Sequence, residues 1–257
     1  AEALRAATPR TLVAACDRVV DDYRRDPDSG RRHYDPAIHA PVVDGDVLPT
    51  DPLAGLAEGR ARGLDLLVCH TAEEYWLFDA VGSSAKVTTD RQLAVFTADF
   101  GLSEALVSAY RAAMPQAPVL DVYLTILGEV MFGEYSRRLA ERHARAGGRA
   151  FLSRFARRPN APGAVPRAWH CADVPFAFGN LDLDEVRFLI GGPADDADRR
   201  LSQRMVRTWA AFAATGDPGW PHLDDTARHT RVWDTRDRPR PAVHAPWSKV
   251  DFGPLYP

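Results

Sequence analysis

The stretch LDLLVCHTAEEYWLF, residues 64–78, decides the fold of this chain. Its first part, LDLLVC at 64–69, is an apolar run of strand length, as expected for a buried parallel strand. The polar turn HTAEE at 70–74 follows directly. Side chains in this turn therefore lie beyond the carboxyl end of a strand, which is where open α/β sheets bind their ligands.

The sequence downstream alternates helical and strand-like segments. Helical patterns occur at 103–114 and 126–146, and Gly147-Gly148 closes the second of them. The segment RAFLSRFA at 149–156 predicts the next strand, and a Pro/Gly-rich loop follows at 157–168. This alternation favours an α/β fold.

Three further helices are predicted from apolar spacing and end signals. They cover residues 9–25 after the Thr8-Pro9 start signal, residues 54–63 up to Gly63, and the segment marked by Leu201, Met205, Val206, Trp209 and Phe212 that stops at Gly216. No strand or loop precedes the first helix. We therefore expect the chain to begin inside a larger fold and to be one part of a single domain, residues 1–257.

Composition excludes several classes of partner. The 257 residues carry 35 acidic and 32 basic side chains, a net charge of −3, which gives no electrostatic basis for binding nucleic acid or an anionic membrane. No run of 18 apolar residues is present, so no membrane span is expected. The arginine clusters at 24–32 and 154–158 are interpreted as solvated faces.

Cysteine and histidine usage predicts neither a cofactor nor a metal. Three scattered cysteines are too few for a disulfide framework, which slightly favours the cytoplasm and leaves the compartment open. There is no CxxC spacing. His70 lies near Glu74 in sequence, but no further ligand accompanies the two, so no metal site is expected there.

The stretch AWHCADVPFAFG, residues 168–179, places His170 just after the loop that follows the second strand. A lone histidine in an apolar stretch is typically a core residue, and a general base is the alternative. An acidic residue after one strand and a histidine after the next is the second half of the Ser…Asp/Glu…His order of α/β-hydrolases.

Four blocks of the sequence, in order, resemble the type-B carboxylesterases, the cholinesterase and para-nitrobenzyl-esterase branch of the α/β-hydrolases. They are PVVDGDVLP (41–49), LLVCHTAEEYWLF (66–78), AWHCADVPFAFG (168–179) and RMVRTWAAFAATGDP (204–218). The resemblance implies the carboxyl-terminal portion of an α/β-hydrolase, with a mostly parallel sheet, helices on both faces and a helical insertion. It places the acidic member of a catalytic triad at Glu74, with Glu73 on the family's preceding Asp, and the triad histidine at His170.

The sequence departs from the family pattern near the expected site. Cys69 and Cys171 stand where the family usually or often has glycine, and Tyr75 and Trp76 replace a more variable pair. These departures put the pocket shape and the substrate range in doubt more than the fold.

The family's nucleophile motif, G-x-S-x-G, and its Gly-rich oxyanion stretch do not occur in this sequence. The nearest string is GLSEA at 101–105, but Ser103 lies between Glu74 and His170 instead of ahead of both. We interpret Ser103 as a helix N-cap. The nucleophilic serine and the oxyanion donors are expected on a missing amino-terminal segment.

Two functions follow from this sequence. The first is a carboxylic-ester hydrolase acting on small-molecule esters, in which this chain supplies Glu74 and His170 and is inactive alone. The alternative is a catalytically inactive, esterase-like binding or scaffold module. The missing amino-terminal half, or an oligomer, is expected to cover an open sheet edge.

The catalytic interpretation carries a geometric expectation. A Glu74 carboxylate oxygen should lie roughly 2.6–3.2 Å from one His170 ring nitrogen. The other ring nitrogen should face an open cleft. Glu73 should point away from the pair, and Asp173 should lie on the far side of its own turn.

Overall fold

The computed structural model describes residues 2–35, 39–159, 167–224 and 229–236. Within them, three parallel strands form a sheet in the order β1 (Asp65–Thr71), β2 (Arg149–Phe155) and β3 (Thr230–Trp233). Most of the predicted loop at 157–168, residues 160–166, lies outside the described residues.

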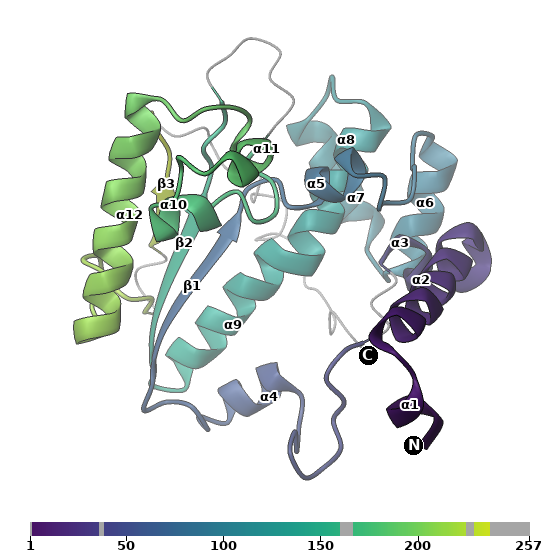
Figure 1. The fold of residues 1–257 in the computed structure, drawn as a ribbon, viewed down its shortest axis with the longest axis horizontal. Helices are drawn as coiled ribbons and strands as arrows, with labels where there is room; N and C mark the ends of the chain where they lie inside the picture. The colour runs from purple at the N-terminus through teal and green to yellow at the C-terminus, as the bar shows by residue number, and fades with distance from the viewer. Residues whose placement is uncertain (1, 36–38, 160–166, 225–228, 237–257) are drawn as a thin grey trace.

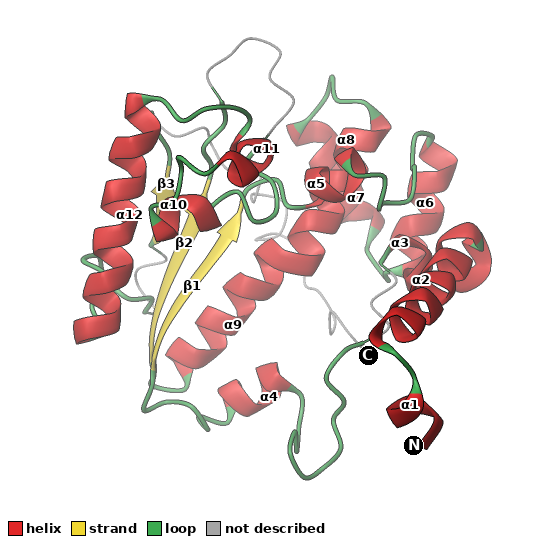
Figure 2. Ribbon diagram, in the orientation of Figure 1, coloured by secondary structure: helices red, strands yellow, loops and turns green. Residues whose placement is uncertain are grey.

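Figure 2 shows that helices make up most of the molecule and lie on both sides of the sheet. The helices in chain order are α1 (Glu2–Ala6), α2 (Pro9–Arg25), α3 (Arg31–Tyr34), α4 (Pro52–Ala57), α5 (Tyr75–Ala80), α6 (Asp90–Asp99), α7 (Glu104–Ala113), α8 (Val119–Gly128), α9 (Glu134–Arg145), α10 (Val174–Phe178), α11 (Arg187–Ile190) and α12 (Asp196–Thr215). Short 3-10 helices cover Pro27–Ser29 and Asp184–Val186, and a π-helix covers Glu129–Gly133.

The two faces of the sheet pack against different helices. Successive side chains of a strand point to opposite faces. Leu152 of β2 accordingly packs in one cluster with Ala140 of α9, and Phe155 packs in another with Leu201 of α12. Figure 1 shows α9 and α12 on opposite sides of the strands. The expected parallel sheet with helices on both faces is confirmed.

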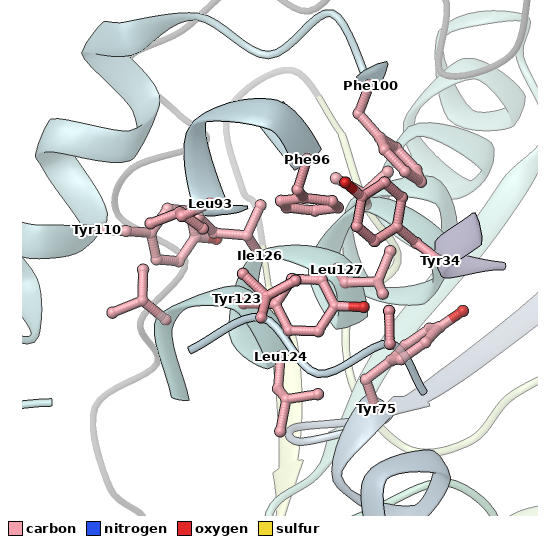
Figure 3. Close-up of a cluster of buried hydrophobic side chains, with 14 of the residues drawn as sticks. Tyr34, Tyr75, Leu93, Phe96, Phe100, Tyr110, Tyr123, Leu124, Ile126 and Leu127 are labelled. Carbon is pink, nitrogen blue, oxygen red and sulfur yellow. The ribbon is translucent and has the colours of Figure 1, made fainter. Parts of the chain in front are cut away.

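The chain between β1 and β2 forms the expected helical insertion, α5 to α9, which has an aromatic core of its own (Figure 3). The ring of Phe96 lies 4.9 Å from Tyr123 and 5.1 Å from Tyr34, centroid to centroid, in edge-to-face geometry. Such aromatic pairs add about 0.5–1.5 kcal/mol beyond their burial. Tyr34 comes from α3, so this core also joins the amino-terminal segment to the insertion.

Three predicted helix ends agree with the structure. Thr8 caps α2 by accepting a hydrogen bond from the Thr11 amide at 3.2 Å. Ser103 caps α7 in the same way, through the Leu106 amide at 3.3 Å. The helix α12 ends where Gly216 adopts φ 71°, a left-handed conformation that glycine takes without a steric cost.

Other predicted boundaries are wrong for local reasons. The helix expected at 54–63 is α4, which begins earlier because Asp51 caps it and Pro52 occupies its first turn. It ends before Gly59, whose φ of 77° stops it short of Gly63. The first strand continues through His70 and Thr71, because both remain paired with β2.

The helix expected at 126–146 is also divided. The π-helix Glu129–Gly133 separates α8 from α9. A β-carbon at position 133 would lie 2.5 Å from Oε2 of Glu129, so Gly133 leaves room for that buried carboxylate. A π-turn of this kind often marks a functional region.

The arginine cluster at 154–158 is not a solvated face. Arg154 and Arg157 are buried, and Arg157 donates two hydrogen bonds to Asp198 of α12, at 2.8 and 2.5 Å. It donates a further hydrogen bond to the backbone carbonyl of Ile190. This bidentate ion pair fixes the start of α12 to the carboxyl end of β2.

We expect Asp198→Ala to destabilise the protein by about 3–5 kcal/mol, because it leaves the Arg157 guanidinium buried without its counter-charge. Urea unfolding measures the change. The matched control is Asp182→Ala, which removes an exposed partner of Arg199 and should cost about 1 kcal/mol or less. Equal effects of the two substitutions would contradict the assignment.

Candidate active site

Glu74 is held rigidly at the end of β1. The strand ends at Thr71, and Glu74 immediately precedes α5. Its side chain is only 5% exposed, and Oε1 accepts a hydrogen bond of 2.6 Å from the Thr71 amide. This local hydrogen bond closes the turn and leaves Oε2 free to contact another part of the chain.

His170 follows β2 in the chain and lies against Glu74, which follows β1. Nδ1 of His170 lies 2.7 Å from Oε2 of Glu74, and the His170 amide donates to the Glu74 carbonyl at 3.2 Å. The expected contact between residues 96 positions apart is therefore confirmed. On the other side, the buried Trp169 donates from Nε1 to the Leu189 carbonyl at 2.8 Å, which anchors the segment.

Two phenylalanines pack against the imidazole. The ring centroid of Phe132, from the π-helix, lies 4.9 Å from that of His170, and that of Phe78, from α5, lies 5.2 Å away. The His170 side chain remains 34% exposed, and no described residue hydrogen-bonds to Nε2. Phe78 and Phe132 also contact each other, with ring centroids 6.4 Å apart, so both support the imidazole from one side.

The electrostatics favour the protonated imidazole. The hydrogen bond to Glu74 and the charge of that carboxylate raise the pKa of His170 above its ordinary value, although burial opposes the change. A buried carboxylate on Nδ1 fixes the tautomer with Nε2 free. It also stabilises the imidazolium that forms when Nε2 accepts a proton. The arrangement can therefore act as a general base and then as a general acid.

Asp173 lies closer to this pair than expected. The turn after His170 is tight, with the Val174 amide donating to the Cys171 carbonyl at 3.2 Å. It returns Asp173 to β1, where the carboxyl group interacts with the Cys69 thiol. Burial, and then the charge of Glu74, raise the pKa of Asp173. The expectation that Asp173 lies on the far side of its turn is wrong, because the chain reverses within three residues.

The same turn gives Cys171 a φ of 64°, in the left-handed region where glycine is favoured. Among the described residues, Cys171 is the one non-glycine residue with a positive φ. Cys171 departs from the family pattern, which often has glycine here, and the left-handed backbone gives a physical reason for that glycine.

Glu73 points away from His170, as expected. Its carboxylate binds Arg158 and Arg167 and accepts a hydrogen bond from the Ala168 amide at 3.1 Å. Sequence reasoning missed Arg158 and Arg167, because pairing between residues 85 and 94 positions apart leaves no local signal. It also missed Phe132, because the sequence does not distinguish this residue from the other apolar residues of a helix.

The remaining candidates do not join the site. The Ser103 hydroxyl is engaged as the cap of α7. His70 is buried on β1, and the part of the chain that the structure describes holds no cluster of three metal-ligating side chains. None of the described helices has the length and apolar character needed to cross a bilayer.

Comparison with known proteins identifies the family that the chain matches. The model of the carboxylesterase family matches residues 1–244. The para-nitrobenzyl esterase of Bacillus subtilis (strain 168) is 26% identical over 202 residues, which cover 76% of this chain and 39% of that protein. The phenmedipham hydrolase of Pseudarthrobacter oxydans is 27% identical over 213 residues, covering 81% and 40%.

Solved structures agree with the sequence comparison. The carboxylesterase EST55 of Geobacillus stearothermophilus superposes with a TM-score of 0.68 at 26% identity, over 81% of this chain and 45% of that one. This chain thus spans about two-fifths of the length of the relatives it matches. Because the family model covers nearly all of its residues and the fold agrees, the chain belongs to the carboxylesterase family.

Proposed function

We propose that this chain contributes the acid and the base of a Ser-His-Glu triad in a carboxylic-ester hydrolase. One observation carries the proposal. The buried Glu74 carboxylate holds Nδ1 of His170 at 2.7 Å, and Nε2 has no described hydrogen-bond partner. Membership of the carboxylesterase family supports small-molecule carboxylic esters as the substrate class.

In the proposed reaction, Nε2 of His170 takes the proton from a serine hydroxyl as its oxygen attacks the ester carbonyl carbon. Glu74 stabilises the imidazolium that results. His170 then gives this proton to the departing alkoxide, which leaves as an alcohol. Water, deprotonated by the same nitrogen, hydrolyses the acyl-enzyme and releases the carboxylic acid. No cofactor takes part.

The serine and the oxyanion donors are proposed to come from a polypeptide segment outside residues 1–257. The sequence has no G-x-S-x-G, and the matches cover only 39% and 45% of the relatives' own length. Several large apolar side chains are exposed, among them Val13 of α2 and Val42, Val43 and Val47. The proposed partner for these surfaces is that segment or an oligomer of the chain.

In the full-length protein, Glu74→Gln should lower kcat on the order of ten-thousand-fold, because the neutral amide no longer stabilises the imidazolium. Adding His170→Ala should cost far less than the sum of the single effects, since triad members act as one unit. Stopped assays with p-nitrophenyl acetate and a double-mutant cycle measure this. Strictly additive losses would refute the triad.

The pH dependence follows from the direction of the His170 shift. Its pKa in the folded protein is raised above 6.5, and only the neutral imidazole acts as a base. The acid limb of kcat/KM should therefore have its midpoint above pH 6.5, and Glu74→Gln should move the midpoint downward. The stability that protonated His170 contributes should be complete below pH 6.5 and lost as pH rises through the raised pKa.

A rate profile from about pH 5 to about pH 9 tests this expectation. The control is Glu58→Gln, which removes an exposed carboxylate that binds Arg60 and should leave the profile unchanged. A midpoint that does not move in Glu74→Gln argues against coupling between Glu74 and His170.

Residues 1–257 prepared alone should not hydrolyse p-nitrophenyl acetate above the buffer rate, because a triad without its nucleophile loses on the order of a millionfold in rate. Turnover that phenylmethylsulfonyl fluoride abolishes would contradict this expectation. In that event Ser103→Ala would decide whether Ser103 is the nucleophile.

A further inference from the structure

Glu73, the residue before the proposed triad acid, binds both ends of the connection between β2 and His170. On the strand side, Arg158 donates to its carboxylate through Nε, at 2.6 Å, and through Nη2. On the histidine side, the Ala168 amide donates to Oε2 at 3.1 Å, and Arg167 donates to Oε1 at 3.3 Å. One side chain therefore joins the entry and the exit of this connection.

A backbone bond completes the attachment. The Glu73 amide donates to the Ala168 carbonyl at 2.8 Å, so residues 73 and 168 contact each other in both directions. The next bond along the chain is the one from the His170 amide to the Glu74 carbonyl. Ala168 is fully buried. The backbone two residues before His170 is thus fixed to the turn that carries Glu74.

The members of this cluster differ in how much they depend on Glu73. Arg167 also lies 3.5 Å from Asp121 and 4.7 Å from the ring of Trp76, so it has other anchors. Arg158 makes no other ion pair among the described residues, and its contact with Glu73 is bidentate, the stronger type of carboxylate bond. Arg158 is about one-third exposed, and its removal leaves the buried Glu73 carboxylate with Arg167 and the Ala168 amide as partners.

We infer that Glu73 and Arg158 form a positioning latch, which holds the His170 segment so that the imidazole meets Glu74 at hydrogen-bond distance. Neither residue touches the reacting atoms. The inference rests on the proposed function for its effect on catalysis, but the position of His170 can be measured without any turnover.

The substitution Arg158→Ala separates the latch from a simple charge effect. The charged groups that face His170 are Glu74 and Asp173. Loss of a nearby cation acts on His170 only by charge and would raise its pKa. A loosened latch lengthens the bond between His170 and Glu74 and lowers the pKa. The sign of the change therefore distinguishes the two explanations.

The experiment uses the full-length protein and its Arg158→Ala and Arg137→Ala variants. Arg137 is the matched control, because it is exposed to the same extent as Arg158 and binds the carboxylates of Glu134 and Glu141 on α9. NMR titration of the His170 ring gives the pKa, and amide hydrogen exchange reports on Ala168 and His170. Assays with p-nitrophenyl acetate give kcat and KM.

We expect Arg158→Ala to lower the His170 pKa, to speed exchange at Ala168 and His170, and to reduce kcat by roughly 10- to 100-fold with little change in KM. Arg137→Ala should change none of these. An unchanged or raised His170 pKa in Arg158→Ala would overturn the latch. A lowered pKa in a protein whose wild type hydrolyses no ester would uphold the latch and reject the proposed function.

Discussion

The parallel pairing of β1 with β2 is the constraint on which the site depends. Residues 65–71 lie beside residues 149–155 in register, so both strands end at the same edge of the sheet. The Ala72 amide then donates to the Phe155 carbonyl at 2.8 Å and extends the pairing one residue beyond β1. Glu74 and His170 are 96 positions apart, and no local structure could bring them together. Their contact is a product of strand register.

The packing around the sheet turns this proximity into a defined geometry. On one side the π-helix brings Phe132 to the His170 ring. On the other side the buried pair of Arg157 and Asp198 holds α12 against the end of β2. Burial has an electrostatic consequence as well, because Glu74 keeps little contact with water and its charge acts on His170 with little screening. Packing and charge therefore position the same histidine.

Much of this architecture could be predicted from the sequence because its signals are local. An apolar run gave β1, helix caps gave the starts of α2 and α7, and the family resemblance pointed to Glu74 and His170. Features that arise from tertiary contact could not be predicted in this way. No pattern near Arg157 in the sequence predicts that it pairs with Asp198, 41 positions away. The interaction of Asp173 with Cys69 depends on where β1 lies in the folded protein. The π-helix likewise accommodates the Glu129 carboxylate, which becomes buried only when the chain folds.

The left-handed backbone of Cys171 affects which substitutions at this position evolution can reach and which the fold favours. A residue other than glycine pays about 1–2 kcal/mol to adopt this conformation. The turn that presents the imidazole therefore carries a conformational cost at position 171, set by the folded backbone and not by the thiol. Cysteine and glycine codons differ by a single base. One point mutation thus leads from the present turn to an unstrained one, so the residue that the backbone favours at position 171 is a single base change away.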